Sequence, residues 1–174
     1  KIITEGLLQL TTIDTILTKA NSDEIRLDEL LWELQSQWAA ANAVLKIKLP
    51  DLPPDEKLLC IYGNRRLLTV ALQNIIRNAF KFSFGKEVTA LLTRNREGLV
   101  LSISDQGIDI APDDLENIFL PLFRSENALA FEGYGIGLSM SRKILQIHQA
   151  RITVSSVLGQ GTTFDIFFTT SPEF

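Results

Sequence analysis

Apolar and polar positions follow helical and strand periods along this chain of 174 residues. Apolar residues recur every three or four positions in three segments, which predicts helices with one buried face at 27–43, 65–82 and 135–148. Alternating or short apolar runs predict strands at 44–49, 58–62, 87–94, 98–104, 151–157 and 162–169. These elements predict an α/β two-layer sandwich, with a mixed, mostly antiparallel sheet and helices on one face.

The sandwich is expected to follow a helical segment at 1–20. Its apolar seam repeats at steps of three and four, through Ile3, Gly6, Leu10, Ile13, Leu17 and Ala20. That pattern fits a dimer-forming, coiled-coil-like helix as well as a helix packed on its own domain. Asn21, Ser22 and Asp23 predict a hinge, and Asp28 is the expected N-cap of the next helix. Residues 106–134 lack a steady period, apart from a short helical piece at 112–117.

Composition narrows the class of protein. A net charge of −4 argues against nucleic acid as a partner, since phosphate binding over a broad surface needs a basic field. No apolar run approaches the roughly 18 residues of a membrane span. The single cysteine, Cys60, excludes an internal disulfide and fits a cytoplasmic setting. Because the chain begins at Lys1, we expect a fragment of a larger protein.

The predicted helix 65–82 has two faces. Its core stripe comprises Leu68, Leu72, Ile75, Ala79 and Phe82. Asn74, Asn78 and Lys81 lie at steps of four and three and share another face. Amide oxygens suit magnesium and an ammonium group suits phosphate, although such residues on a helix can also form a polar solvent face.

Asp105 ends a strand whose inward positions are apolar. Leu99, Leu101, Ile103 and Asp105 share one face by the period of two. A carboxylate at the edge of a core needs hydrogen-bond donors. Asp105 could therefore accept a hydrogen bond from a ligand, or cap the turn that follows it.

Four stretches fall in a particular order: NIIRNAFKFS at 74–83, DQGIDI at 105–110, GYGIGLS at 133–139 and GQGTTF at 159–164. Together they resemble the catalytic ATP-binding domain of sensor histidine kinases, of the group that includes gyrase, Hsp90 and MutL. The resemblance covers about residues 25–170. It implies a Bergerat-type fold at 23–174, after a segment at 1–22 that ends a dimerisation helix and forms a hinge.

The resemblance also implies roles for individual residues. Asn78 would be the magnesium ligand, and the catalytic residues would be Asn78, Lys81 and Arg124. The residues implied to bind ATP are Asn74, Asn78, Lys81, Phe82, Asp105, Gly107, Ile110, Gly133, Gly135, Gly137, Leu138 and Thr162. Related ATPases carry a water-activating glutamate where this chain has Asn74. An amide cannot take that proton, which favours phosphoryl transfer over hydrolysis.

The chain departs from the family pattern at several places. Asp109 occupies a glycine position, where a positive φ is expected and its charge would lie near the nucleotide. Leu122 and Phe123 stand at two usually aromatic positions. Arg124 could approach the γ-phosphate or stand in solvent, within a predicted ATP lid that extends to Glu132. His148 is expected to be a charged helix-terminal residue, and the phosphoacceptor histidine to lie upstream of Lys1.

The predicted function is transfer of the γ-phosphate of Mg-ATP to a histidine on a dimerisation helix, as part of two-component signalling. The implied partners are the protein's own phosphoacceptor domain, a response regulator and a second copy in a full-length homodimer, which could be membrane-anchored. Three alternatives remain: a regulatory nucleotide-binding module without kinase activity, an ATPase of the gyrase or Hsp90 type, and an anti-sigma serine kinase.

Overall fold

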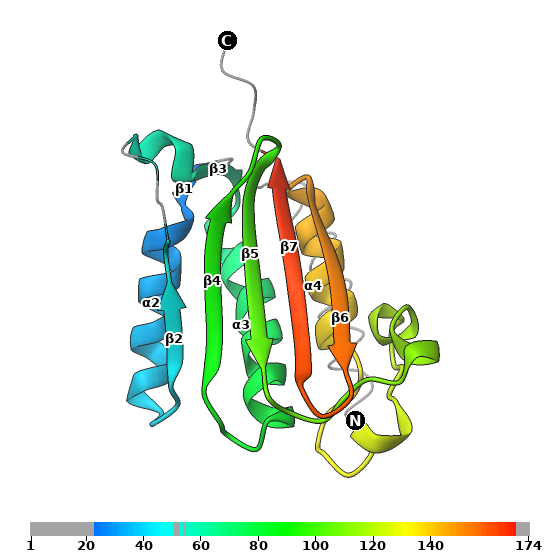
Figure 1. Cartoon of the computed structure of the whole chain (residues 1–174). Helices are drawn as coiled ribbons and strands as arrows, with labels where there is room; N and C mark the ends of the chain where they lie inside the picture. The colour runs from blue at the N-terminus through cyan, green and yellow to red at the C-terminus, as the bar shows by residue number, and fades with distance from the viewer. Residues whose placement is uncertain (1–22, 51–52, 54, 170–174) are drawn as a thin grey trace.

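The computed structural model describes residues 23–50, 53 and 55–169. A five-stranded sheet with the order β2-β4-β5-β7-β6 lies in one layer, and its helices cover one face (Figure 1). The strands are β2 (Leu45–Lys48), β4 (Val88–Arg94), β5 (Gly98–Asp105), β6 (Ala150–Val157) and β7 (Gly161–Thr169). Only β2 and β4 pair in parallel. The predicted two-layer sandwich with a mixed, mostly antiparallel sheet is confirmed.

The second layer consists of α2 (Leu27–Ala40), α3 (Arg65–Phe82) and α4 (Gly137–Ile147) (Figure 1). The predicted core stripe of α3 is confirmed at Leu68, Leu72, Ile75 and Ala79, which are all buried. Phe82 was placed in that stripe wrongly, because it is only half-buried and Phe80 is buried instead. Phe80 packs against Trp38 of α2, with ring centroids 5.0 Å apart.

A two-stranded sheet that the sequence pattern did not predict lies beside the main sheet. β1 (Asp23–Arg26) pairs antiparallel with β3 (Cys60–Gly63), after the short helix η1 (Glu56–Leu59). The hinge prediction is therefore wrong at Asp23, while 1–22, with the predicted dimerisation helix, lies outside the described residues. That domain boundary stays a prediction.

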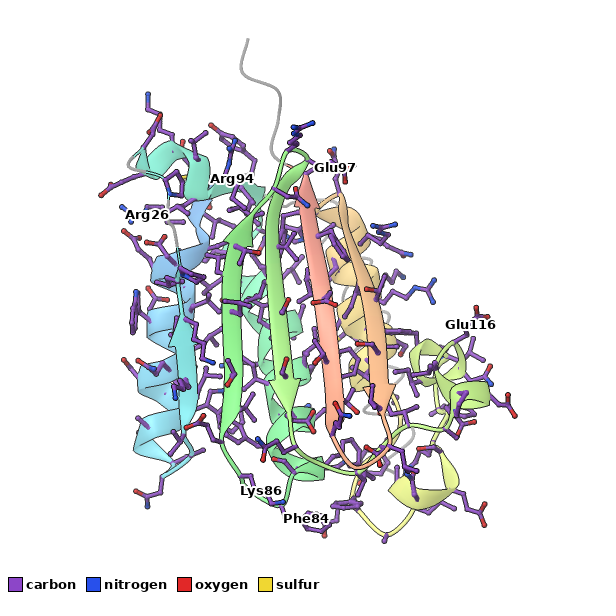
Figure 2. All side chains as sticks on the ribbon, in the orientation of Figure 1. Arg26, Phe84, Lys86, Arg94, Glu97 and Glu116 are labelled. Carbon is purple, nitrogen blue, oxygen red and sulfur yellow. The ribbon has the colours of Figure 1, made fainter. Side chains whose placement is uncertain are left out.

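Arg26, at the end of β1, is the N-cap of α2, so the N-cap prediction is wrong. The predicted N-cap, Asp28, lies within the first turn of α2, and Arg26 occupies the N-cap position. The Arg26 guanidinium contacts the Asp28 carboxylate at 2.7 Å and the Glu56 carboxylate at 2.5 Å. This pairing holds the pKa of Asp28 below its usual value despite burial, which pushes the pKa upward. Figure 2 labels Arg26 at one end of the molecule, and Phe84 and Lys86, after α3, at the other.

An irregular segment between β5 and α4 lies near that other end, beside the ends of β6 and β7 (Figure 1). It contains three short 3-10 turns: η2 (Pro112–Asp114), η3 (Asn117–Phe119) and η4 (Glu126–Ala128). The predicted helical piece at 112–117 is thus two separate turns, and α4 starts two residues after the predicted Gly135. This segment closes one side of the cavity described next.

Candidate nucleotide site

A cavity of about 800 Å³ lies between α3, the end of β5, the start of β7 and the irregular segment. This volume falls in the range of small-molecule sites, about 300–1,000 Å³. Most residues predicted from the sequence to bind ATP line it: Asn74, Asn78, Lys81, Phe82, Asp105, Ile110, Gly133, Gly135, Gly137, Leu138 and Thr162, together with Arg124. Segments far apart in the sequence therefore meet at one site.

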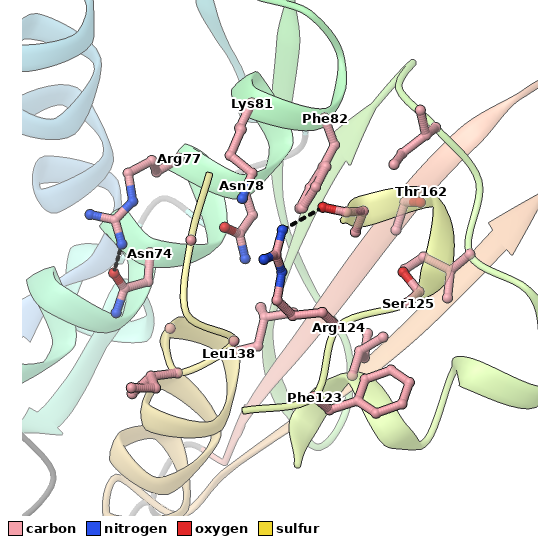
Figure 3. A pocket seen from close by; sticks show the side chains of 18 of the residues that line it. Asn74, Arg77, Asn78, Lys81, Phe82, Phe123, Arg124, Ser125, Leu138 and Thr162 are labelled. Carbon is pink, nitrogen blue, oxygen red and sulfur yellow. Dashed lines mark hydrogen bonds between the residues drawn. The ribbon is translucent and has the colours of Figure 1, made fainter. Parts of the chain in front are cut away.

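The polar face of α3 forms one wall. Asn74 is 6% exposed and lies at the cavity, and Asn78 and Lys81 follow along the same face (Figure 3). The Lys81 ammonium lies 4.3 Å from the centroid of the Phe82 ring. The cavity thus presents amide groups, a cation and an aromatic face along a single helix.

Asp105 lies at the edge of the core, as its strand position predicted. The side chain is 6% exposed, and Oδ1 accepts a hydrogen bond from the Gly107 backbone N–H at 2.8 Å. The turn-capping interaction considered above is therefore present, and Asp105 still lines the cavity. Burial raises the pKa of Asp105 to about 6; the Gly107 hydrogen bond lowers it, and the charge of Asp109 raises it further.

Gly107 is the one predicted ATP-binding residue that does not line the cavity. Its backbone packs so closely beneath Phe82 that a Cβ atom would lie 2.5 Å from the Phe82 carbonyl oxygen. The neighbouring Ile108 N–H donates to that same carbonyl at 3.1 Å. Gly107 therefore joins the end of β5 to the end of α3, which holds Asp105 and Phe82 near each other.

Asp109 differs from the sequence expectation. It does not adopt a positive φ. Its carboxylate accepts hydrogen bonds from two backbone N–H groups of the β6–β7 turn, Gly159 at 2.8 Å and Gly161 at 3.2 Å. Since backbone donors stabilise a carboxylate, Asp109 anchors this turn to the loop after β5. Its charge stays at the cavity wall, but it is partly compensated there.

Arg124 and Lys81 both donate to main-chain carbonyls of the irregular segment. Arg124 Nη2 bonds to Ala128 O at 2.8 Å and also to Phe131 O. Lys81 Nζ bonds to Glu132 O at 2.7 Å. The guanidinium of Arg124 is half-buried and lines the cavity, so it does not simply stand in solvent, while its approach to the γ-phosphate stays a prediction. Burial lowers the pKa of Lys81, and the nearby charges of Arg124 and Arg77 lower it further.

Two glycines of the glycine-rich segment at the start of α4, Gly135 and Gly137, have different surroundings. Gly135 has a φ of 69°, and a Cβ there would lie 2.5 Å from the Phe123 carbonyl oxygen, so a side chain is sterically excluded. Gly137, the first residue of α4, has room, with the nearest atom 3.7 Å away on Asn74. Within the described parts of the chain, no side chain caps the start of this helix. The first N–H groups of α4 therefore lie beside the cavity, in an arrangement that favours an anion.

Two observations test whether these residues fit ATP and magnesium. Among the described residues, the buried donor Asn74 Nδ2 has no hydrogen-bond partner, and a phosphate oxygen would supply the missing acceptor. Among the residues that the structure describes, no cluster of three or more acidic, histidine or cysteine side chains could hold a metal alone. The Asn78 amide oxygen at the cavity is a hard ligand of the kind that Mg²⁺ takes together with substrate phosphates. The residues fit both groups.

Sequence reasoning missed Arg77, which also lines the cavity. Its Nη2 donates to Asn74 Oδ1 at 2.5 Å (Figure 3). The spacing of three residues from Asn74 on a helix was a signal that could have identified it.

His148 is the C-cap of α4, as expected. It is 8% exposed, and its Nε2 accepts the Asn64 backbone N–H at 3.0 Å. Its Nδ1 lies 2.7 Å from the Ile144 carbonyl oxygen and donates to it. Nε2 also lies 3.3 Å from the Asn64 carbonyl oxygen, so Asn64 and Ile144 together hold the ring in place. The charge of the imidazole stays a prediction.

The fold and the cavity define a two-layer α/β domain whose cavity lies between a buried acid and a glycine-rich helix start. Residues 63–172 match the family model for histidine kinase-, DNA gyrase B- and HSP90-like ATPases, and the chain belongs to this family. Within it, the chain is the catalytic ATP-binding domain of the sensor histidine kinase type.

Relatives and solved structures support that placement. The chain is 38% identical over 140 residues to the adaptive-response sensory kinase SasA of Synechococcus elongatus, covering 79% of this chain and 35% of that protein. It is 32% identical over 173 residues to the heme sensor protein HssS of Staphylococcus saprophyticus, covering 98% of this chain and 36% of that protein.

Two solved structures share the fold. The mycobacterial sensor histidine kinase MprB has a TM-score of 0.71 at 20% identity, over 88% of this chain and all of that one. The catalytic domain of the histidine kinase ThkA also has a TM-score of 0.71, at 21% identity, over 87% of this chain and 99% of that one. Within the part of the chain that the structure describes, no helix has the length and apolar character that a bilayer crossing requires.

Proposed function

We propose that this chain binds Mg-ATP and delivers its γ-phosphate to a histidine on a dimerisation helix of the same kinase. The observation that carries the proposal is the Asn74 Nδ2 donor, which has no partner among the described residues and lies beside Asn78, Lys81 and the open start of α4. A cluster of donors and cations around a vacant acceptor position suits a polyphosphate. A structural neighbour, ShkA, was solved in complex with AMPPNP, which supports ATP as the ligand.

In this proposal, the roles of the residues follow their positions. Asp105 accepts a hydrogen bond from the adenine amino group, and Phe82 borders the purine. Lys81 and Arg124 exchange their carbonyl partners for phosphate oxygens, and Asn78 binds the metal. Magnesium would supply charge neutralisation at the phosphates when bound.

The transfer itself needs groups beyond this domain. A histidine nitrogen forms a bond to the γ-phosphorus while the bond to the β–γ bridging oxygen breaks and ADP leaves. The proton of the histidine passes to a base beside it on the acceptor domain. This domain contributes position and charge stabilisation, which supply most of the catalysis in phosphoryl transfer.

The wider context is part of the same proposal. The chain spans about a third of the two relatives described above, so the acceptor helix would belong to a longer protein. We propose a homodimer in that full-length form, with a response regulator as the final acceptor of the phosphoryl group. This fragment would face the cytoplasm, where ATP is available, whether or not the full-length protein is membrane-anchored.

Calorimetric titration of this chain with ATP and ADP, with and without magnesium, tests the proposal. We expect saturable binding that strengthens when magnesium is added. A longer chain that includes the dimerisation helices should then incorporate phosphate from ATP into an acid-labile, base-stable phosphohistidine. Magnesium-independent binding without transfer would favour the regulatory module, and an absence of binding up to millimolar nucleotide would contradict the proposal.

A further inference from the structure

Arg77 is a cation at the cavity that the proposed roles do not use. It lies on α3, three residues after Asn74 and directly before Asn78, and it lines the cavity at its exposed margin. Figure 3 shows Arg77 and Asn74 on one side of the cavity and Thr162 on the opposite side, with Asn78 between them. Arg77 therefore lies on the side of the site opposite Thr162.

The surroundings of Arg77 hold few competing charges. Its one recorded hydrogen bond is to the Asn74 carbonyl oxygen at 2.5 Å, and no carboxylate lies within 4.0 Å of it among the residues that the structure describes. The neutral amide positions the guanidinium without neutralising it. An anion entering this end of the cavity would meet a full positive charge.

The same place gathers two further donors. A Cβ atom built on Gly137 would lie 3.9 Å from Arg77 Nη2 and 3.7 Å from Asn74 Cγ, so both side chains lie against the start of α4. Asn74 is only 6% exposed, and its Nδ2 has no hydrogen-bond partner within the part of the chain that the structure describes. A guanidinium, an unpartnered amide donor and a helix N-terminus thus converge on one point.

We propose that Arg77 binds the terminal phosphate of a nucleoside triphosphate and makes this site favour ATP over ADP. The inference rests on the proposed function and adds the residue that recognises the third phosphate. Lys81 and Arg124 lie between Arg77 and Thr162 and would contact the inner phosphates (Figure 3). Only the γ-phosphate reaches the far end, where a planar guanidinium can bind two of its oxygens.

The test compares Mg-ATP with Mg-ADP by calorimetry for the wild-type chain, Arg77→Gln, Arg77→Lys and Arg66→Gln. Arg66 is an exposed arginine on the same helix that does not line the cavity, so its variant controls for the lost charge. Arg77→Gln should weaken Mg-ATP binding about tenfold, as expected for a hydrogen bond to a charged group, and change Mg-ADP binding less than about twofold. Arg77→Lys should fall between, since it keeps the charge but loses the fork.

The ratio of the affinity for Mg-ATP to the affinity for Mg-ADP distinguishes recognition of the third phosphate from a purely structural role of Arg77. A purely structural Arg77 would change ATP and ADP binding equally, and that result, or an unchanged ratio, would overturn the inference while leaving the proposed function intact. A wild-type chain that bound neither nucleotide would overturn both. The inference is supported if Arg77→Gln lowers the ratio of ATP affinity to ADP affinity and Arg66→Gln leaves that ratio unchanged.

Discussion

Replacing Asp105 with asparagine separates the effect of charge from that of shape. The two side chains have nearly the same size, and the asparagine oxygen can still accept the Gly107 N–H that Asp105 accepts at 2.8 Å. The turn after β5 should therefore persist. The substitution removes one buried negative charge, and this loss should affect stability and nucleotide recognition in opposite directions.

The stability effect follows from the pKa of Asp105. A rise from 3.8 to about 6 corresponds to at most about 3 kcal/mol at neutral pH, and screening by water in the open cavity reduces it. Because the folded state holds its proton more tightly, this carboxyl makes the protein less stable as pH rises from about 3.8 to about 6. We expect Asp105→Asn to increase the free energy of unfolding at pH 7 by roughly 1–2 kcal/mol, and by much less at pH 4.

The recognition effect has the opposite sign. A hydrogen bond to a charged acceptor contributes about 1.5–3 kcal/mol, so loss of the carboxylate should weaken ATP binding by roughly 10- to 150-fold. GTP should lose less, because the asparagine amide can donate to the guanine carbonyl. Wild-type affinity for ATP should also fall as pH drops below about 6, where Asp105 takes up a proton, while Asp105→Asn should lack this pH dependence.

Two assays check these expectations: urea denaturation at pH 4 and pH 7, and nucleotide titration between pH 5.5 and pH 8. Asp113→Asn, which changes an exposed acid in η2, controls for net charge. The reasoning about Asp105 fails if the variant keeps its full preference for ATP over GTP. It also fails if the gain in stability is the same at both pH values.

Three further substitutions examine other parts of the site and core. Asn78→Ala should abolish most of the strengthening of ATP binding by magnesium and leave the urea midpoint nearly unchanged; Gln73→Ala on the same helix is the control in the same titration. Gly107→Ala should reduce nucleotide affinity and lower the melting temperature, because its Cβ would lie 2.5 Å from the Phe82 carbonyl oxygen; equal calorimetric and thermal behaviour to wild type would contradict this. Leu72→Ala, at a fully buried position, should lower the free energy of unfolding by about 2–5 kcal/mol in urea, and a loss below about 1 kcal/mol would show that α3 is not packed as described.

The spacing of apolar residues was enough to predict most helices and strands, because burial of one face requires that spacing. The inward face of β5 alternates apolar side chains up to Asp105, and α3 carries a buried stripe, so sequence and structure agree there. β1 escaped prediction because four residues, with only Ile25 buried, give no period to detect. Its pairing with β3 depends on a contact between distant parts of the chain.

In the candidate site, too, some positions could be predicted from the sequence and others could not. Amides and a lysine spaced along one helix could be assigned to one face, since helix geometry determines their positions. The partners of Asp109 could not, because they belong to the β6–β7 turn, 50 residues further along the chain. The contact between His148 and Asn64 likewise joins residues that are 84 positions apart.

The hydrogen bonds of Lys81 and Arg124 bear on how any measured affinity should be interpreted. Both cations already bond to carbonyls of the segment between Ala128 and Glu132. Phe131 of this segment also packs against Phe82, with ring centroids 5.1 Å apart. A phosphate that recruits either cation must replace these bonds, so the net gain is smaller than that of an unpaired cation. Arg77, whose recorded partner is a neutral amide, gives up least, and the preference for a third phosphate should therefore depend on it more than on the other two.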